Sequence, residues 1–134
     1  MGHYVQSLCY KSRGVSDPSL IYVCRSSTQQ YSRLRRIYIL FSAPHGLRSA
    51  DEAMLAELDT QVQQFGGTKF TLQAIITKAD QLGDSGREHV DQMKNAIFQA
   101  APTCLPPIIT ACPSNGSNFG IELVRKSITD CCGL

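Results

Sequence analysis

The sequence predicts an α/β fold in which three strand–helix units form a parallel sheet. From residue 34 onward, each of three short apolar runs is followed by a stretch whose apolar residues recur at helical spacing. Strands that alternate with helices in this way favour a parallel sheet, because a parallel pair needs a long crossover connection. The chain has 134 residues, of which 43% are hydrophobic and 18% are charged, which is typical of one globular domain.

The first unit begins with the strand Ile37–Phe41, whose nearly continuous apolar sequence predicts a strand covered on both faces. After the turn at 44–46, Ser49 and Glu52 have the spacing of a helix capping box. Gly66-Gly67 is expected to end this helix. Its apolar positions recur at helical spacing and are Met54, Leu55, Leu58, Val62 and Phe65.

The second unit begins with a predicted strand over Phe70–Ile76, followed by a polar turn at 83–86. A helix is then predicted, and Pro102 is expected to end it. The apolar stripe of this helix is Val90, Met93, Ile97 and Ala100.

The third unit begins with a predicted strand over Pro107–Ala111, followed by a loop rich in Gly, Ser and Asn at 113–118. A last helix follows. The residues expected to share its apolar face are Ile121, Val124, Ile128 and Cys131.

The most informative motif is Thr77-Lys78-Ala79-Asp80, which directly follows the second strand. Many GTP-binding domains hold guanine with a Thr/Asn-Lys-x-Asp quartet, in which the aspartate accepts two hydrogen bonds from the base and the lysine stem covers its edge. In a parallel sheet, ligands bind beyond the carboxyl ends of the strands, so the quartet and residues 110–118 are expected to meet there. The structural alternative for this quartet is a capping loop with one solvated lysine.

The sequence lacks the motif that would hold the phosphates of such a nucleotide. No G-x-x-x-x-G-K-S/T phosphate loop occurs in the 134 residues. Without its lysine, and without Mg²⁺ held by a hydroxyl and an acid, phosphoryl transfer has no assignable machinery. The chain is therefore predicted to carry half of a nucleotide site, with no catalytic residue.

Several segments together resemble the EngB-type (YihA-like) P-loop GTPases. The similarity runs through residues 34–47 and Ala50-Asp51, then the quartet, and then Thr110-Ala111-Cys112 followed by Phe119-Gly120-Ile121. It covers residues 31–134 and implies the C-terminal half of a P-loop GTPase sheet, a partial G domain. Residues 1–30 do not resemble the family and form a separate leader.

The resemblance implies guanine-nucleotide binding, with GTP or GDP as ligand and Mg²⁺ in the family but no ligand for it assignable here. The guanine-binding residues that it implies are Thr77, Lys78, Asp80, Thr110, Ala111 and Cys112. Ala111-Cys112 replaces the Ser-Ala that the family has in its last loop. The family's role in large ribosomal subunit assembly implies the ribosome as partner, and similarity to fungal members in residues 100–107 implies mitochondria, with the cytoplasm as alternative.

The front end of the chain differs in composition from the rest. Residues 1–36 hold six basic residues and one acid, Asp17, and have no apolar run long enough for a secretory signal or a membrane span. This composition suits an organellar transit peptide or a disordered leader. The six cysteines show no C-x-x-C pair and no histidine at zinc spacing, which favours free thiols. His45 and His89 have no partner at catalytic spacing.

A second interpretation is a truncated fragment that binds no nucleotide, in which a leader has replaced the catalytic half. The strand Ile37–Phe41 would then be an exposed apolar edge, since the strand that the family places beside it is missing. Such a fragment is expected to self-associate or to act as an interaction module through this edge, unless the leader folds back and covers it.

Overall fold

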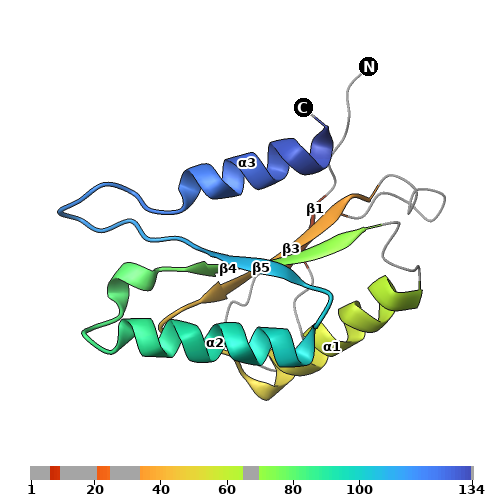
Figure 1. Cartoon of the computed structure of the whole chain (residues 1–134), viewed down its shortest axis with the longest axis horizontal. Coiled ribbons are helices and arrows are strands. Elements are labelled where there is room, and N and C mark those ends of the chain that lie inside the picture. Colours follow the sequence, from red (N-terminus) through yellow and green to blue (C-terminus); the bar gives the residue numbers. More distant parts are fainter. Residues whose placement is uncertain (1–6, 10–20, 25–33, 65–69, 134) are drawn as a thin grey trace.

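In the computed structural model of the chain, a five-stranded sheet lies between two layers of helices (Figure 1). The structure describes residues 7–9, 21–24, 34–64 and 70–133. The strands are β1 (Ser7–Cys9), β2 (Ile21–Cys24), β3 (Arg36–Ser42), β4 (Thr71–Thr77) and β5 (Leu105–Ile109). The helices are α1 (Ser49–Gln64), the short 3-10 helix η2 (Ala79–Gln81), α2 (Gly86–Ala100) and α3 (Ile121–Cys132).

The predicted parallel sheet is confirmed for β3, β4 and β5. β3 and β4 pair in register from Arg36↔Thr71 to Ser42↔Thr77, and β5 is parallel to β4 on its other side. The carboxyl ends of all three strands therefore meet at one edge of the sheet, as the strand–helix order requires.

The prediction of an exposed β3 edge is wrong for the part of the strand that β2 covers, and there the structure shows the alternative in which the leader folds back onto this edge. β2 runs antiparallel to β3 with the pairs Ile21↔Ile39 and Tyr22↔Tyr38, and β1 pairs antiparallel with β2. The front of the chain thus supplies two strands that the apolar periodicity did not predict. Their short length, three and four residues, explains why the pattern gave no signal.

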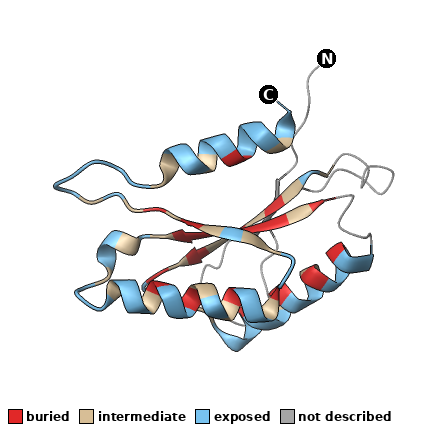
Figure 2. Ribbon diagram, in the orientation of Figure 1, coloured by how far each residue is buried: buried red, intermediate tan, exposed pale blue. Residues whose placement is uncertain are grey.

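The hydrophobic core lies between the sheet and the layer formed by α1 and α2 (Figures 1 and 2). β3 alternates between buried and half-buried residues, so only one of its faces is fully covered and the expectation of two covered faces is wrong. β4 lies at the centre of the parallel strands and is buried from Leu72 to Ile76. The core side chains from the two helices are Leu55, Val62, Val90, Met93 and Ile97.

The opposite face of the sheet is polar where α3 covers it. Ser127, the buried residue of α3, donates a hydrogen bond to Gln73 Oε1 at 2.5 Å. Arg36 donates to Ser127 Oγ at 2.7 Å, and the Tyr38 hydroxyl lies 2.9 Å from the same atom. This network turns Ser127 toward the sheet and leaves Ile128 44% exposed, so the predicted apolar face of this helix is correct except at Ile128.

The cap of α1 lies one residue earlier than predicted. Asp51 Oδ2 accepts a hydrogen bond from the backbone N–H of Arg48 at 3.0 Å, so the reciprocal bond of a capping box comes from Asp51 and not from Glu52. The buried side chain of Asp51 explains the shift, since Glu52 is exposed. The expected stop at Gly66-Gly67 lies outside the described residues.

β5 begins two residues before the predicted strand and ends two residues before its predicted end. Its two prolines, Pro106 and Pro107, are tolerated because β5 is an edge strand and because they lie where its pairing with β4 shifts register, between the pairs Gln73↔Leu105 and Ile75↔Ile108. Ala111 has already left the strand and forms an isolated antiparallel bridge with Phe119. This bridge closes the loop that carries the second half of the candidate site.

Candidate functional site

The quartet leaves β4 through an unusual backbone conformation. Thr77 is the last residue of β4, and Lys78 follows with φ 58° and ψ 34°, in the left-handed region. Among the described residues it is the one non-glycine residue with positive φ. Such conformations are costly for a residue with a Cβ and gather at functional sites. The turn at Lys78 starts η2 and leaves the side chains of Lys78 and Asp80 exposed.

The two threonines of the predicted site have structural roles. The Thr77 hydroxyl donates to the carbonyl oxygen of Phe41 at 3.3 Å, and the buried Thr110 hydroxyl donates to the carbonyl oxygen of Ile76 at 3.4 Å. Both hydroxyls therefore tie neighbouring strands together at their carboxyl ends. In these bonds, neither hydroxyl points toward a ligand.

The structure brings the quartet and the last loop into direct contact. The backbone N–H of Cys112 donates to Asp80 Oδ1 at 3.1 Å, and the N–H of Ala79 donates to the carbonyl oxygen of Thr110 at 3.2 Å. The expectation that these two segments meet beyond the strand ends is confirmed. Among the described residues, Asp80 Oδ2 accepts no hydrogen bond and the Lys78 ammonium forms no ion pair.

Of the backbone N–H groups of Thr110, Ala111 and Cys112, only that of Cys112 is not used by the sheet or by the loop bridge. The N–H of Thr110 donates to Ile76 at 2.8 Å, and the N–H of Ala111 donates to Phe119 at 3.1 Å. These two bonds belong to the sheet and to the loop bridge. The N–H of the exposed Cys112 is the donor that faces the Asp80 carboxylate.

Gly120 holds this loop against the end of β5 and was not predicted as a site residue. It begins α3 with φ 78°, and a Cβ built on it would lie 1.9 Å from the carbonyl oxygen of Ile109. Only glycine fits this close approach. The sequence signal that could have found it is a glycine directly before an apolar helical stripe, which is a weak signal on its own.

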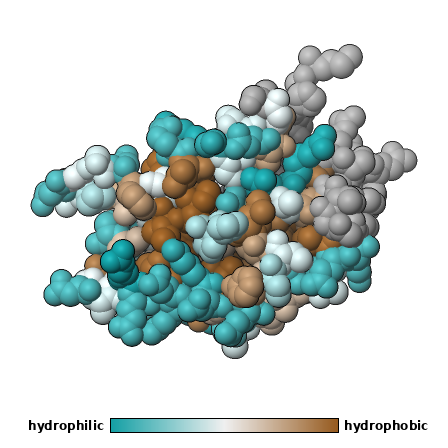
Figure 3. Space-filling model, viewed as in Figure 1, coloured by the Kyte–Doolittle hydropathy of each residue, from teal (hydrophilic) through white to brown (hydrophobic). Residues whose placement is uncertain are grey.

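An open cavity of about 460 Å³ lies behind the quartet, between η2, the first half of α2 and the end of β5. Its apolar lining includes Leu82, Val90, Ile109 and Phe119, and Figure 3 shows apolar surface gathered over the sheet between α3 and α2. Lys78, Asp80 and Cys112 do not line it. Ala79 of the quartet does line it, so the cavity adjoins the quartet on the side away from Cys112.

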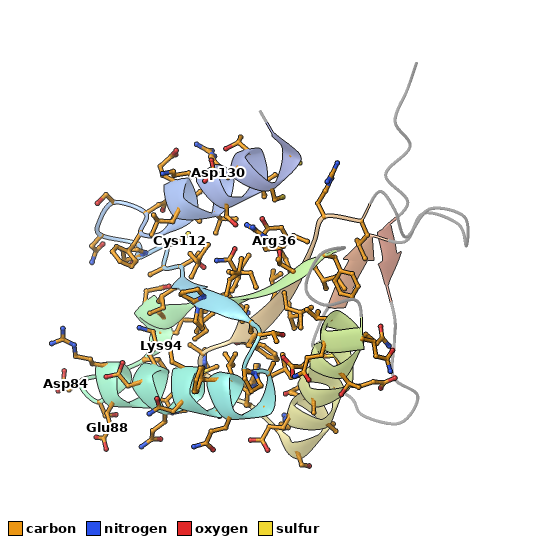
Figure 4. All side chains as sticks on the ribbon, turned by 45° about the vertical axis from the view of Figure 1, so that its right-hand side comes forward. Arg36, Asp84, Glu88, Lys94, Cys112 and Asp130 are labelled. Carbon is orange, nitrogen blue, oxygen red and sulfur yellow. The ribbon has the colours of Figure 1, made fainter. Side chains whose placement is uncertain are left out.

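The charged residues near the start of α2 point away from the predicted site. Figure 4 shows Asp84 and Glu88 at the outer end of α2, whereas Cys112 lies on the loop beneath α3. His89, expected on a polar helix face, is half-buried, and its Nε2 lies 2.8 Å from the carbonyl oxygen of Ala43. His89 therefore fixes the turn after β3.

Within residues 34–64 and 70–133, four cysteines are free thiols, namely Cys104, Cys112, Cys131 and Cys132. Burial raises the pKa of the Cys104 thiol, which makes it a poor nucleophile. The described residues contain no group of three or more His, Cys, Asp or Glu side chains placed to hold a metal ion. No helix in the described ranges is both long and apolar enough to span a membrane.

The three parallel strands, with helices on both faces and the loops at their carboxyl ends in contact through Asp80 and Cys112, define the class: an α/β fold of the kind found in the C-terminal half of a P-loop GTPase. The chain is 34% identical over 98 residues to the "Probable GTP-binding protein EngB" of Roseobacter denitrificans. It is 33% identical over 96 residues to the protein of that name from Cereibacter sphaeroides and 30% identical over 95 residues to that from Ruegeria pomeroyi. With this fold, the matched part of the chain resembles a partial EngB-like G domain, from the C-terminal part of these proteins.

The matches cover 71–72% of this chain and 40–41% of each of these relatives, so the chain spans about two fifths of their length. No protein-family model matches the chain. No solved structure matches it either.

Proposed function

We propose that the chain binds the guanine base of GTP or GDP at the edge formed by Lys78, Asp80 and Cys112. The observation that carries this proposal is the hydrogen bond between Asp80 and the N–H of Cys112, which unites the two segments that such a site needs. The similar proteins are named as GTP-binding proteins, which supports the same ligand class.

In this proposal, Asp80 accepts two hydrogen bonds from N1–H and the exocyclic amine of guanine. Its Oδ2 is free among the described residues, and its Oδ1 is held by Cys112. On binding, the N–H of Cys112 turns from the carboxylate to the carbonyl oxygen of guanine, while the aliphatic stem of Lys78 covers the base. Adenine presents an amine where guanine has that carbonyl, so it would leave the N–H of Cys112 unpaired, at a cost of about 1–3 kcal/mol.

Base binding, without hydrolysis, is the activity that we assign to these residues. The sequence contains no phosphate-loop motif. No metal-binding cluster occurs within the described residues, so no residue is assigned to Mg²⁺ and no step depends on it. Base contacts alone correspond to an affinity in about the millimolar range, once the entropy of association is subtracted.

We further propose that the chain shares the family's association with large ribosomal subunit assembly and that it acts in mitochondria. The first proposal depends on the similarity to EngB proteins. The second depends on the basic, serine-rich front of the chain, which is typical of an organellar transit peptide. Finding the tagged full chain in the cytoplasm would contradict the second proposal.

The test is a nuclear magnetic resonance titration of the full chain with GDP and ADP at millimolar concentration, following backbone amide shifts. We expect saturable shifts at Cys112 and Asp80 with GDP, and at least tenfold weaker binding of GDP by Asp80→Asn. Asp84→Asn is the matched control, because Asp84 is exposed and points away from the site (Figure 4). Equal shifts with GDP and ADP would contradict recognition of guanine, and no shift with either would favour the interpretation as a non-binding fragment.

A further inference from the structure

The two edges of the parallel part of the sheet are protected in different ways. β5 carries Pro106 and Pro107, which lack backbone N–H groups and therefore discourage pairing with another strand. β3 has no proline, and its one charged residue is Arg36 at its start. The five residues that follow Arg36 are apolar or aromatic, which is the composition that makes an open edge prone to association.

β2 is the strand that occupies the open side of β3. It pairs through Ile21↔Ile39 and Tyr22↔Tyr38, and β1 extends the sheet outward from it. The pairing reaches as far as Ile39, so Leu40–Ser42 have β4 as their one strand partner among the described elements. The contact is therefore short compared with the seven-residue pairing on the other side of β3.

We propose that β2, extended by β1, acts as an internal strand partner for β3, and that the β3 edge becomes a self-association surface when β2 is displaced. The partner is a second copy of this chain, which pairs β3 with β3 in the antiparallel sense that β2 already uses. The proposal concerns the sheet edge and is independent of nucleotide binding.

The sequence of β3 is self-complementary in this arrangement. An antiparallel pair centred on Ile39 places Ile39 opposite itself, so Ile37 lies opposite Phe41 and all three buried side chains stay on the core side. Arg36 then lies opposite Ser42 of the second copy, and the two arginines do not face each other. A two-fold pairing of this kind buries the same surface on both copies and closes without further growth.

The experiment measures the mass of the full chain in solution by light scattering over a range of concentrations. Tyr22→Pro places a residue that disfavours strand pairing at the position opposite Tyr38, and Ser27→Pro is the matched control outside the two strands. We expect the wild type and Ser27→Pro to be monomers and Tyr22→Pro to show at least a twofold higher mass at the same concentration. A peptide of residues 17–28 in excess should return Tyr22→Pro to a monomer, whereas a scrambled peptide should not.

Amide hydrogen exchange shows whether the higher mass of Tyr22→Pro comes from association of a folded domain or from unfolding. In an intact Tyr22→Pro domain, the amides of β4 stay protected because β4 lies inside the sheet. If Tyr22→Pro loses this protection, Tyr22→Gly is used in its place, since glycine weakens the strand and keeps its N–H. A folded variant that stays monomeric like Ser27→Pro, or a wild type that associates as strongly as the variant, would overturn the proposal.

Discussion

The carboxylate of Asp80 accepts a hydrogen bond from the backbone N–H of Cys112, across 32 residues of sequence. This bond holds the acidic group of the quartet against the N–H of Cys112, which, unlike the N–H groups of Thr110 and Ala111, is not used by the sheet or by the Ala111–Phe119 bridge. A carboxylate held in this way loses little side-chain entropy when a ligand binds, which favours recognition. We therefore expect that a ligand that binds at this edge affects both Asp80 and Cys112.

Because Gly120 lies very close to Ile109, adding a methyl group at Gly120 is expected to destabilise the fold strongly. We expect Gly120→Ala to lower the free energy of unfolding by about 2–4 kcal/mol, through backbone strain at φ 78° and overlap with the Ile109 carbonyl oxygen. Gly133→Ala is the matched control, because Gly133 has φ 73° but no atom lies within 4 Å of the place that its Cβ would take, so only about 1 kcal/mol is expected. Urea unfolding measures both values, and equal losses would contradict the assigned overlap.

The hydrogen bonds of Ser127 predict that the packing of α3 on the sheet depends on this one buried hydroxyl. Ser127→Ala leaves Gln73 and Tyr38 without this partner and should cost about 2–3 kcal/mol of unfolding free energy. Arg36 keeps a second bond to the carbonyl oxygen of residue 127 at 3.2 Å, which limits the loss. Ser114→Ala, at an exposed loop position, should stay within about 0.5 kcal/mol of the wild type in the same assay.

Tyr38 predicts a loss of stability at alkaline pH. Burial raises the pKa of Tyr38 above its ordinary value of about 10, so the folded chain favours the neutral phenol. The unfolded chain therefore ionises first, and this contribution to stability is complete below pH 10 and is lost as the pH rises above it. Tyr38→Phe should have a shallower loss between pH 9 and pH 11, measured by urea unfolding at each pH. An unchanged slope would contradict the role assigned to Tyr38.

The parallel part of the fold could be predicted because its signals are local. The strand of Ile37–Phe41 and the helix with Val90, Met93 and Ile97 follow from apolar periodicity, and both are present. The contact between Asp80 and the last loop followed from topology alone, since parallel strands gather their carboxyl ends at one edge.

The remaining features depend on tertiary contacts that no periodicity reveals. The β1–β2 pair is too short for a pattern, and its place on β3 is set by long-range pairing. The inward turn of Ser127 depends on polar partners in two strands, and the requirement for Gly120 depends on the position of Ile109. The hydroxyls of Thr77 and Thr110 were expected at the ligand, but their bonds to neighbouring strands use them within the sheet.

The central claim, that guanine binds between Asp80 and Cys112, is tested most directly by protection of the Cys112 thiol. The full chain is treated with iodoacetamide in the presence of millimolar GDP or ADP, and the alkylation of each cysteine is followed by mass spectrometry. Cys112 and Cys132 are both exposed, and Cys132 lies at the far end of α3, so it is the internal control. The account predicts that GDP slows alkylation of Cys112 several-fold, that ADP does not, and that neither changes Cys132. Alkylation of Cys112 at the same rate with GDP as with ADP would contradict it.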